Sequence, residues 1–254
     1  MNISLKGQTI VVTGGAKRVG GAIALQCAQS GADVAITFNT SGEAASTLVA
    51  QLEHQFPDQK FAALRCELSQ SAAIADLLPK ILHKFGSVSA LVNNAAIFRR
   101  TPFSETTSSD WERAFDDHIA ANLKAPYLLG KHFGDYFLEQ QNGCIINIAD
   151  IYGLRPLKNY APYCVSKAGL VMLTEVLAKA LAPDVRVNCI CPGTILLPSE
   201  IQDEGEDVEL LTQRIPLNRL GTPEEIAQTV VFLIGGPQFI SGAVLAVDGA
   251  QRLK

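Results

Sequence analysis

Short runs of apolar, often β-branched residues alternate with longer amphipathic stretches along most of this chain. The first run covers residues 9–13 and is followed by a glycine-rich turn and an apolar stretch of helical spacing. Runs that are apolar throughout are typical of strands buried on both faces, and their alternation with helices indicates a parallel sheet. The sequence therefore predicts an α/β fold, a doubly wound parallel sheet with helices on both faces.

The expected elements follow this rhythm over all 254 residues. We expect strands over residues 9–13, 33–41 including the strand exit, 60–66, 87–93, 144–148, 185–190 and 243–249. We expect helices over 22–28, 46–56, 71–85, 108–133 (one helix or two), 163–180, 208–214 and 223–233. With no repeat and no linker, residues 1–254 are expected to form a single domain. Around residues 195–215 we expect a substrate flap, with a plain surface excursion as the alternative.

Composition excludes several classes of protein. The formal net charge of −4 gives no reason to expect a nucleic-acid or membrane-surface partner. No apolar run is long enough to predict a membrane span, and the N-terminus shows no signal-peptide pattern. The six cysteines form no CxxC or Cys/His cluster, so we expect free thiols, no metal site and a cytoplasmic protein. We expect Cys189 and Cys191 to face opposite sides of their strand.

A glycine-rich turn follows the first expected strand. It runs Gly14-Gly-Ala-Lys-Arg-Val-Gly-Gly21 and leads into a helix. Strand, glycine turn and helix together present backbone N–H groups to a phosphate at a helix N-terminus, as in a Rossmann-like fold. The spacing departs from strict G-x-G-x-x-G, so a mere tight turn is the alternative for this stretch taken alone.

The exit of the second strand carries no carboxylate. In a dinucleotide-binding sheet this edge meets the adenosine ribose, where an acidic side chain favours NAD. Here the exit is Asn39, Thr40 and Ser41, while Lys17 and Arg18 lie in the glycine turn. Polar and positive groups without an acid favour a 2′-phosphate, so we expect NADP(H) as the cofactor. Solvated loop residues are the alternative for the two basic side chains.

Tyr163 and Lys167 are four residues apart in an expected helix, so their side chains share one face. Free tyrosine, with a pKa of about 10, is a poor acid at neutral pH. A nearby ammonium would stabilise the phenolate and lower that pKa, making the pair a proton relay. Asp150, just before a turn-rich segment, is placed to reach the same point. A surface tyrosine and a solvated lysine are the ordinary interpretation of an isolated pair.

These features together resemble the short-chain dehydrogenase/reductase family over nearly the whole chain. The matching segments are Thr13-Gly14 to Gly20, Asn93-Asn94-Ala95, Asn122, Tyr163-x-x-x-Lys167, Pro192-Gly193 and the ending Ile240-Ser-Gly to Asp248-Gly249. Several motifs in order over this length are specific, so the resemblance overrides the ordinary interpretation of the tyrosine and lysine. It also implies a homotetramer in which residues 161–180 pack between subunits.

The resemblance implies a role for each matched residue. Tyr163 and Lys167 are catalytic, and Asn122 holds a water that extends the proton path. The implied cofactor contacts are Gly14, Lys17, Arg18, Val19, Gly20, Asn39, Thr40, Ser41, Glu67, Leu68, Asn94, Ala95, Tyr163, Lys167, Pro192 and Gly193. Glu67 stands where the family usually has an aspartate beside the adenine.

Two departures narrow the resemblance to the pteridine reductase branch. Asp150 stands thirteen residues before Tyr163, where most of the family has serine, and Arg18 replaces a glycine. The stretch 94–103 also looks like that branch, which reduces dihydropterins, and in some members oxidised pterins or folates, with NADPH. The resemblance implies that Asp150 is catalytic and that Arg18, Phe98, Asp150 and Tyr163 contact the substrate, with Phe98 stacking on the pterin ring.

Reduction of a C=N bond is consistent with an aspartate, rather than a serine, at position 150. A serine hydroxyl suits a carbonyl oxygen because it donates to the charge that builds there, whereas a pterin nitrogen needs a full proton. We therefore predict NADPH-dependent reduction of a pterin, dihydropterin or dihydrofolate. One alternative is a carbonyl or 3-oxoacyl reductase of the same family, which a basic patch for a phosphopantetheine carrier would favour. The other is a dinucleotide-binding member without catalysis.

Overall fold

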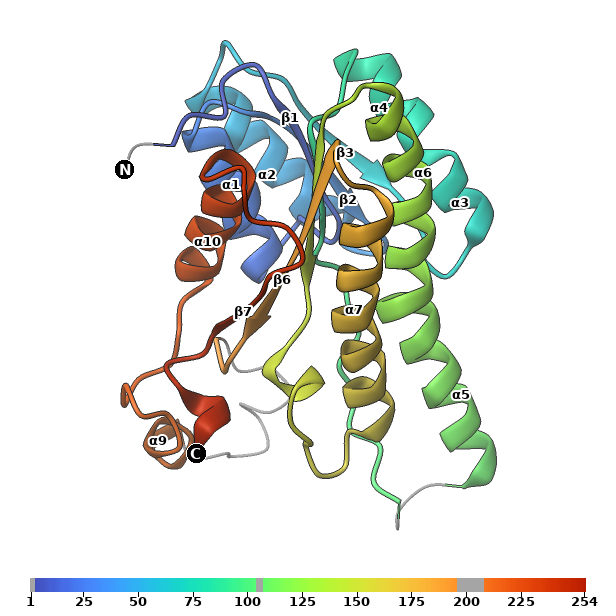
Figure 1. Cartoon of the computed structure of the whole chain (residues 1–254), viewed down its shortest axis with the longest axis vertical. Coiled ribbons are helices and arrows are strands. Elements are labelled where there is room, and N and C mark those ends of the chain that lie inside the picture. The colour runs from blue at the N-terminus through green and yellow to red at the C-terminus, as the bar shows by residue number, and fades with distance from the viewer. Residues whose placement is uncertain (1–2, 104–106, 196–207) are drawn as a thin grey trace.

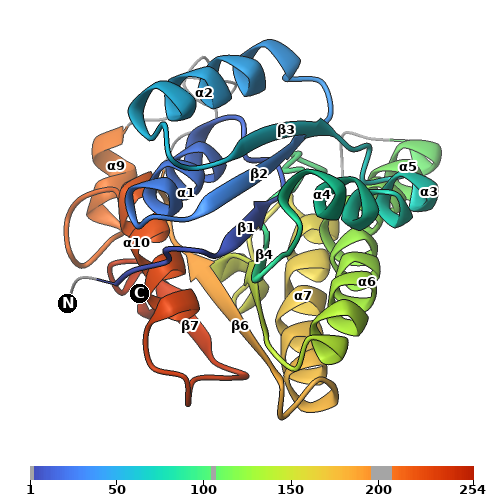
Figure 2. The same cartoon turned by 90° about the horizontal axis from the view of Figure 1, so that it is seen from above.

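A single sheet of seven parallel strands runs through the molecule (Figures 1 and 2). The computed structural model describes residues 3–103, 107–195 and 208–254. The strands lie in the order β3-β2-β1-β4-β5-β6-β7. Their bounds are β1 Thr9–Val12, β2 Asp33–Phe38, β3 Phe61–Arg65, β4 Ala90–Asn93, β5 Gly143–Ile148, β6 Val185–Pro192 and β7 Val244–Val247. The predicted Rossmann-like parallel sheet is confirmed.

Helices cover both faces of this sheet (Figure 2). One face carries α1 (Arg18–Gln29), α2 (Gly42–Gln55) and α10 (Pro223–Gly235). The other carries α3 (Ser71–Ala75), α4 (Leu77–Phe85), α6 (Ala125–Glu139) and α7 (Ala161–Ala180). The remaining elements are α5 (Ser108–Ile119), η1 (Ala120–Lys124), η2 (Ile151–Gly153), α9 (Val208–Gln213) and η3 (Gln251–Leu253).

The two apolar cores follow from strand alternation. In β1, Ile10 and Val12 point into the core under α1 and α10, whereas Val11 points into the core under α4 and α6. Both faces are buried, which is why the strand is apolar throughout rather than alternating. Because β2 and β4 flank β1, the strand order reverses there and opens a crevice at the carboxyl ends of the strands.

Two expected helices are interrupted. Residues 71–85 form α3 and α4, which meet at Asp76. Residues 108–133 begin as α5 and continue into α6, but Ala120–Lys124 between them is a π-helical turn. Such turns insert one residue into the helical ladder and are frequent at functional sites. Here the turn carries Asn122.

The flap expected around residues 195–215 falls mainly on residues 196–207, which lie outside the described residues. Only Ile195, α9 and the residues after it are described. By length and composition, α7 is the one helix in the described chain that would be long and apolar enough to cross a membrane. In this fold α7 packs against β6, and its Leu170 and Leu177 are buried in the cores, as in the core helix of a globular protein.

The start of α10 offers a stability test. Thr222 Oγ1 accepts from Glu225 N at 3.3 Å and Glu225 Oε2 accepts from Thr222 N at 2.9 Å, a capping box that precedes Pro223 at the first helical position. Thr222→Ala is expected to lower the free energy of unfolding by about 1 kcal/mol, measured by urea denaturation. Thr229→Ala, inside the same helix, is the control. An equal loss in both variants would contradict the capping role.

Candidate active site

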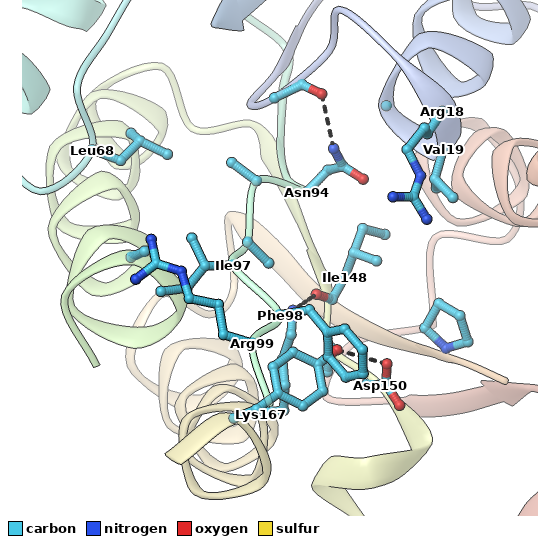
Figure 3. A pocket seen from close by; sticks show the side chains of 18 of the residues that line it. Arg18, Val19, Leu68, Asn94, Ile97, Phe98, Arg99, Ile148, Asp150 and Lys167 are labelled. Atoms are coloured by element: carbon cyan, nitrogen blue, oxygen red, sulfur yellow. Dashed lines mark hydrogen bonds between the residues drawn. The ribbon is translucent and has the colours of Figure 1, made fainter. Parts of the chain in front are cut away.

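A cavity of about 910 Å³ lies along the carboxyl ends of the strands (Figure 3). Apart from Asn122, it is lined by every residue predicted from sequence to bind cofactor or substrate or to act in catalysis. Figure 3 shows Arg18 and Val19 beside Asn94, with Asp150 and Lys167 at the end of the cavity away from Leu68. The sheet therefore brings residues from distant parts of the sequence to one place.

The glycine turn fits a phosphate group. Gly14 has φ +62°, and a Cβ on Gly20 would lie 2.2 Å from the Gly14 carbonyl oxygen, so neither position accepts a side chain without strain. At the N-cap of α1, Lys17 makes no side-chain capping bond. The first N–H groups of a helix need an acceptor, and a cofactor phosphate is a suitable one. Arg18 has φ +52°, a conformation that favours glycine.

Asn94 ties the end of β4 to this turn. Its Nδ2 donates to Thr13 O at 2.9 Å and to Gly14 O at 3.2 Å. In return, Thr13 Oγ1 accepts from the N–H groups of Asn94 and Ala95, both at 3.0 Å. The sequence analysis did not assign a role to Thr13, although its position at the end of a buried strand indicates a structural hydroxyl. These four hydrogen bonds hold the residues after β1 to the residues after β4, beside the cavity and at the point where the strand order reverses.

The part of the cavity at the ends of β2 and β3 is polar, and the lining residues at the β2 exit carry no carboxylate. Asn39, Thr40 and Ser41 line it together with Glu67 and Leu68, as the sequence predicts for the ribose and adenine. Glu67 accepts a hydrogen bond from Ser69 Oγ at 2.9 Å. The chemistry of these donors fits a nucleotide, and the residues meet only because β2 and β3 are neighbours in the sheet.

Asp150 and Tyr163 are directly hydrogen-bonded. Tyr163 Oη donates to Asp150 Oδ2 at 2.7 Å, and Asp150 Oδ1 accepts from the N–H of Tyr152 at 2.8 Å. Burial raises the pKa of the Asp150 carboxyl above its ordinary 3.8, although both hydrogen bonds and the charge of Lys167 act in the opposite direction. The site therefore holds a carboxyl that takes up a proton more readily than an exposed one.

The effect of Lys167 on Tyr163 differs from the sequence expectation. Lys167 Nζ donates to Ile148 O at 2.8 Å and lies 5.8 Å from the centroid of the Tyr163 ring. The pKa of Tyr163 is raised well above 10, first by burial and then by the charge of Asp150. The predicted lowering by Lys167 is therefore wrong for the protein without ligands. Burial also lowers the pKa of Lys167 itself, partly offset by Asp150.

Asn122 stands behind the cavity and is fully buried, as predicted. Its Oδ1 accepts from Ile97 N at 2.8 Å, and its Nδ2 donates to Ile97 O at 3.0 Å and to Ser166 Oγ at 3.1 Å. Both side-chain donors are used within the protein. Asn122 thus holds the loop after β4 against α7, and its contact with a water stays a prediction.

The ring of Phe98 contacts two tyrosines. It is stacked on Tyr160, with centroids 4.5 Å apart and planes inclined by 12°, and meets Tyr163 edge-on at 4.7 Å. Phe98 was expected to stack on a substrate ring, and here an aromatic ring of the protein covers one of its faces. Sequence analysis missed Tyr160, which belongs to the same Tyr-x-x-Tyr stretch as Tyr163.

The end of β6 closes the cavity near the reacting residues. Gly193 N donates to Val247 O at 3.0 Å, and a Cβ on Gly193 would lie 2.7 Å from Gln251 Oε1. Only glycine fits between the strand and the C-terminal turn. Earlier in β6, Cys189 and Cys191 lie on the same side of the strand, so the expectation that they face opposite sides is wrong. Their Sγ atoms are 3.9 Å apart because residues two apart in a strand share a face.

Fold and site together define a class of protein. A glycine turn at the first crossover of a parallel sheet accepts a dinucleotide, and a buried tyrosine beside a carboxyl and a lysine is placed to move a proton. This combination defines a dinucleotide-dependent oxidoreductase.

Comparison with known proteins gives the family. Residues 13–250 match a family model described as enoyl-(acyl carrier protein) reductase. The chain is 32% identical over 247 residues to 3-oxoacyl-(acyl-carrier-protein) reductase of Thermotoga maritima, with 96% of this chain and 98% of the relative covered. It is 33% identical over 251 residues to the Synechocystis protein named as the same reductase, covering 98% of each. It is also 31% identical over 254 residues to 3β-hydroxysteroid dehydrogenase 1 of Eggerthella lenta, covering 98% of this chain and 95% of the relative.

The chain belongs to the short-chain dehydrogenase/reductase family, whose members use a nicotinamide dinucleotide. The three relatives are named for 3-oxoacyl or hydroxysteroid chemistry, and none of these names mentions a pterin. The comparisons therefore support the family but not the pteridine reductase branch.

Proposed function

We propose that this chain is an NADPH-dependent reductase of a C=N bond in a dihydropterin, pterin or dihydrofolate. The observation that carries the proposal is the partly buried hydrogen bond of 2.7 Å between Tyr163 Oη and Asp150 Oδ2. A carboxylate next to a developing oxyanion would repel it, whereas a carboxyl group that is protonated can pass a proton through Tyr163 to a nitrogen, and burial of Asp150 favours its protonated form.

The proposed reaction adds one hydride and one proton across the C=N bond. A bound nicotinamide cofactor would supply the hydride for the carbon. Tyr163 gives its proton to the nitrogen as the electron pair of the C=N bond moves there, and the protonated Asp150 carboxyl then returns a proton to the phenolate. Lys167, buried beneath the tyrosine ring, would hold the ribose and offset the negative charge of the phenolate.

The residues of the glycine turn and of the β2 exit would hold the cofactor. The uncapped N-terminus of α1 faces the cavity through Lys17, Arg18 and Val19, which suits the pyrophosphate. Asn39, Thr40 and Ser41 with Lys17 would bind a 2′-phosphate, because a carboxylate that would repel it is missing there.

Adding a carboxylate at the β2 exit should reverse this preference. Asn39→Asp is expected to raise the Kd of NADPH by on the order of tenfold through repulsion of the 2′-phosphate, while NADH binding is kept or improved. Fluorescence titration with both cofactors measures the change. Ser46→Asp adds the same charge to an exposed position of α2 outside the cavity and is the control. Equal weakening of both cofactors by Asn39→Asp would contradict the assignment.

A carbonyl reductase is the second candidate function. The names of two relatives, each aligned with nearly the whole chain, describe 3-oxoacyl-(acyl-carrier-protein) reduction, and they support this alternative better than a pterin substrate. In that reaction Tyr163 would protonate the alkoxide, and the Asp150 carboxyl would have to be protonated to stand beside it.

One comparison of substrates decides between the two. NADPH oxidation is followed by absorbance with dihydrobiopterin, dihydrofolate and an acetoacetyl thioester in parallel. Turnover of a pterin or folate alone supports the C=N proposal, and turnover of the thioester alone replaces it by the carbonyl alternative. NADPH binding without turnover of any of them would support a non-catalytic member of the family. The homotetramer and the cytoplasmic location stay predictions.

A further inference from the structure

The cavity continues past the reacting residues. It is also lined by Tyr152 of η2, Leu157 of the loop after it, Leu211 of α9 and Arg214 just after α9. None of the four was predicted from sequence to act in catalysis or to bind cofactor or substrate, although Leu211 and Arg214 lie within residues 195–215, where the substrate flap was expected. The wall is apolar where the leucines lie, and it carries two hydrogen-bond donors, the phenol of Tyr152 and the guanidinium of Arg214.

The backbone of Arg214 is held by hydrogen bonds, and its side chain lines the cavity. Its N–H donates to Leu211 O at 3.1 Å, and the next residue, Ile215, is buried and donates to Thr212 O at 2.9 Å. Among the residues that the structure describes, the guanidinium has no hydrogen-bonded or ion-paired partner.

Several other arginines of the chain are engaged. Arg219 pairs with Glu225 at 2.6 Å, Arg155 donates to Gln251 O at 2.6 Å, and Arg186 donates to carbonyl oxygens at the end of α10 and in the loop after it. Arg214 differs from these three because its donors have no partner in the described part of the chain and because it lines the cavity. A guanidinium in that position is suited to recognise a planar carboxylate or a phosphate.

Tyr152 links this cation to the reacting carboxyl. Its N–H donates to Asp150 Oδ1 at 2.8 Å, so its backbone is in direct contact with the group that bonds Tyr163. Its hydroxyl has no hydrogen-bond partner within the described part of the chain. Burial and the charge of Asp150 raise the pKa of Tyr152, and the positive charges of Arg155 and Arg214 oppose this rise. Tyr152 therefore keeps its proton as a donor and lies in the field of Arg214.

We propose that Arg214, with the hydroxyl of Tyr152, binds an anionic group of the substrate that is remote from the reacting bond. This inference rests on the proposed function and deepens it, because it separates the folates, which carry carboxylates on a glutamyl tail, from pterins with an uncharged side chain. Arg214 and Tyr152 could also bind the phosphates of a thioester carrier. The test therefore includes both sources of the anionic group, a folate carboxylate and a carrier phosphate.

The test compares matched charged and uncharged substrates. The first pair is dihydrofolate and dihydrobiopterin, and the second is acetoacetyl-coenzyme A and acetoacetyl-N-acetylcysteamine. Arg214→Gln is expected to raise KM for the charged member of the active pair about tenfold or more, the size of a lost charge-assisted hydrogen bond, with kcat retained. KM for the uncharged member should not change. Arg214→Lys, which keeps the charge but not the fork, should restore part of the affinity.

Arg252→Gln is the matched control. Arg252 is an exposed arginine in η3 that does not line the cavity, so its loss changes the net charge equally without touching the site. An equal change of KM for both members of a pair, or no change for either, would overturn the proposal.

Failure of the proposed function has a different signature. If only the thioesters are turned over, the C=N reaction is wrong, while the second pair still tests Arg214. Calorimetric binding of all four compounds gives the same comparison without turnover. A wild-type protein that shows no preference for the charged members would also overturn the role of Arg214.

Discussion

Tyr163→Phe is expected to lower kcat by on the order of a thousandfold while leaving NADPH affinity near that of the wild type. The change removes one oxygen from a buried side chain whose ring is held between Phe98 and His118. The ring packing therefore survives. What is lost is the only phenolic proton bonded to Asp150 in the described site.

Two measurements separate the proton role from a structural one. NADPH binding by fluorescence and thermal unfolding should both resemble the wild type, and only turnover should fall. Tyr127→Phe removes the hydroxyl of a half-exposed tyrosine on α6 and should change none of the three. Turnover of Tyr163→Phe within a few-fold of the wild type would mean that the proton comes from another group. Loss of NADPH binding would mean that the hydroxyl holds the cofactor instead.

The fold was predictable because burial acts on every strand. Val11 and its neighbours in β1 are apolar since helices cover both faces, and this leaves a pattern that sequence analysis can use. The carboxyl ends of parallel strands share an edge, so Gly14, Asn94 and Asp150 could be placed in one cavity without coordinates. Gly14 and Asn94 were found because they follow strand ends, whereas Tyr163 and Lys167 on α7 were found from their four-residue spacing and the family resemblance.

What could not be predicted depends on distances that no local pattern encodes. The π-helical turn carries Asn122, whose side chain satisfies the backbone of Ile97, a contact across 25 positions that no local pattern shows. The raised pKa of Tyr163 is set by burial against the charge of Asp150, two quantities that need the packed structure. Arg214 follows an acidic segment in the sequence, and only its place at the cavity wall distinguishes it from a solvated charge.

The Tyr160–Phe98 stack was missed for the same reason. The sequence shows two tyrosines three positions apart, but not which of them the ring of Phe98 covers. A flat substrate ring on Phe98 must use the face that Tyr160 leaves open or displace Tyr160. The ring of Phe98 is therefore compatible with stacking on a planar heterocycle. Which face of Phe98 the heterocycle would use depends on the packing of Tyr160.

Asp150→Ser is expected to lower turnover of a pterin or folate substrate by on the order of a hundredfold, because a hydroxyl cannot return a full proton to Tyr163. The hydroxyl can still donate to an oxyanion, so turnover of the acetoacetyl thioester should be retained or improved. The ratio of kcat/KM for the two substrates, measured in the wild type and in the variant, gives the effect of the carboxyl on substrate class. An equal fall for both substrates would show that Asp150 only positions the tyrosine.

The pH dependence of Asp150→Asn completes this argument. Burial raises the pKa of the wild-type carboxyl above 3.8, so its protonated form is present below that raised pKa and is lost as the pH rises through it. Wild-type kcat for the C=N substrate should therefore fall on the alkaline side of the Asp150 titration. The side-chain amide of the variant does not titrate, so the variant should show a low kcat without that limb. If the wild type and Asp150→Asn have pH profiles of the same shape, the carboxyl does not carry the proton in the C=N reaction.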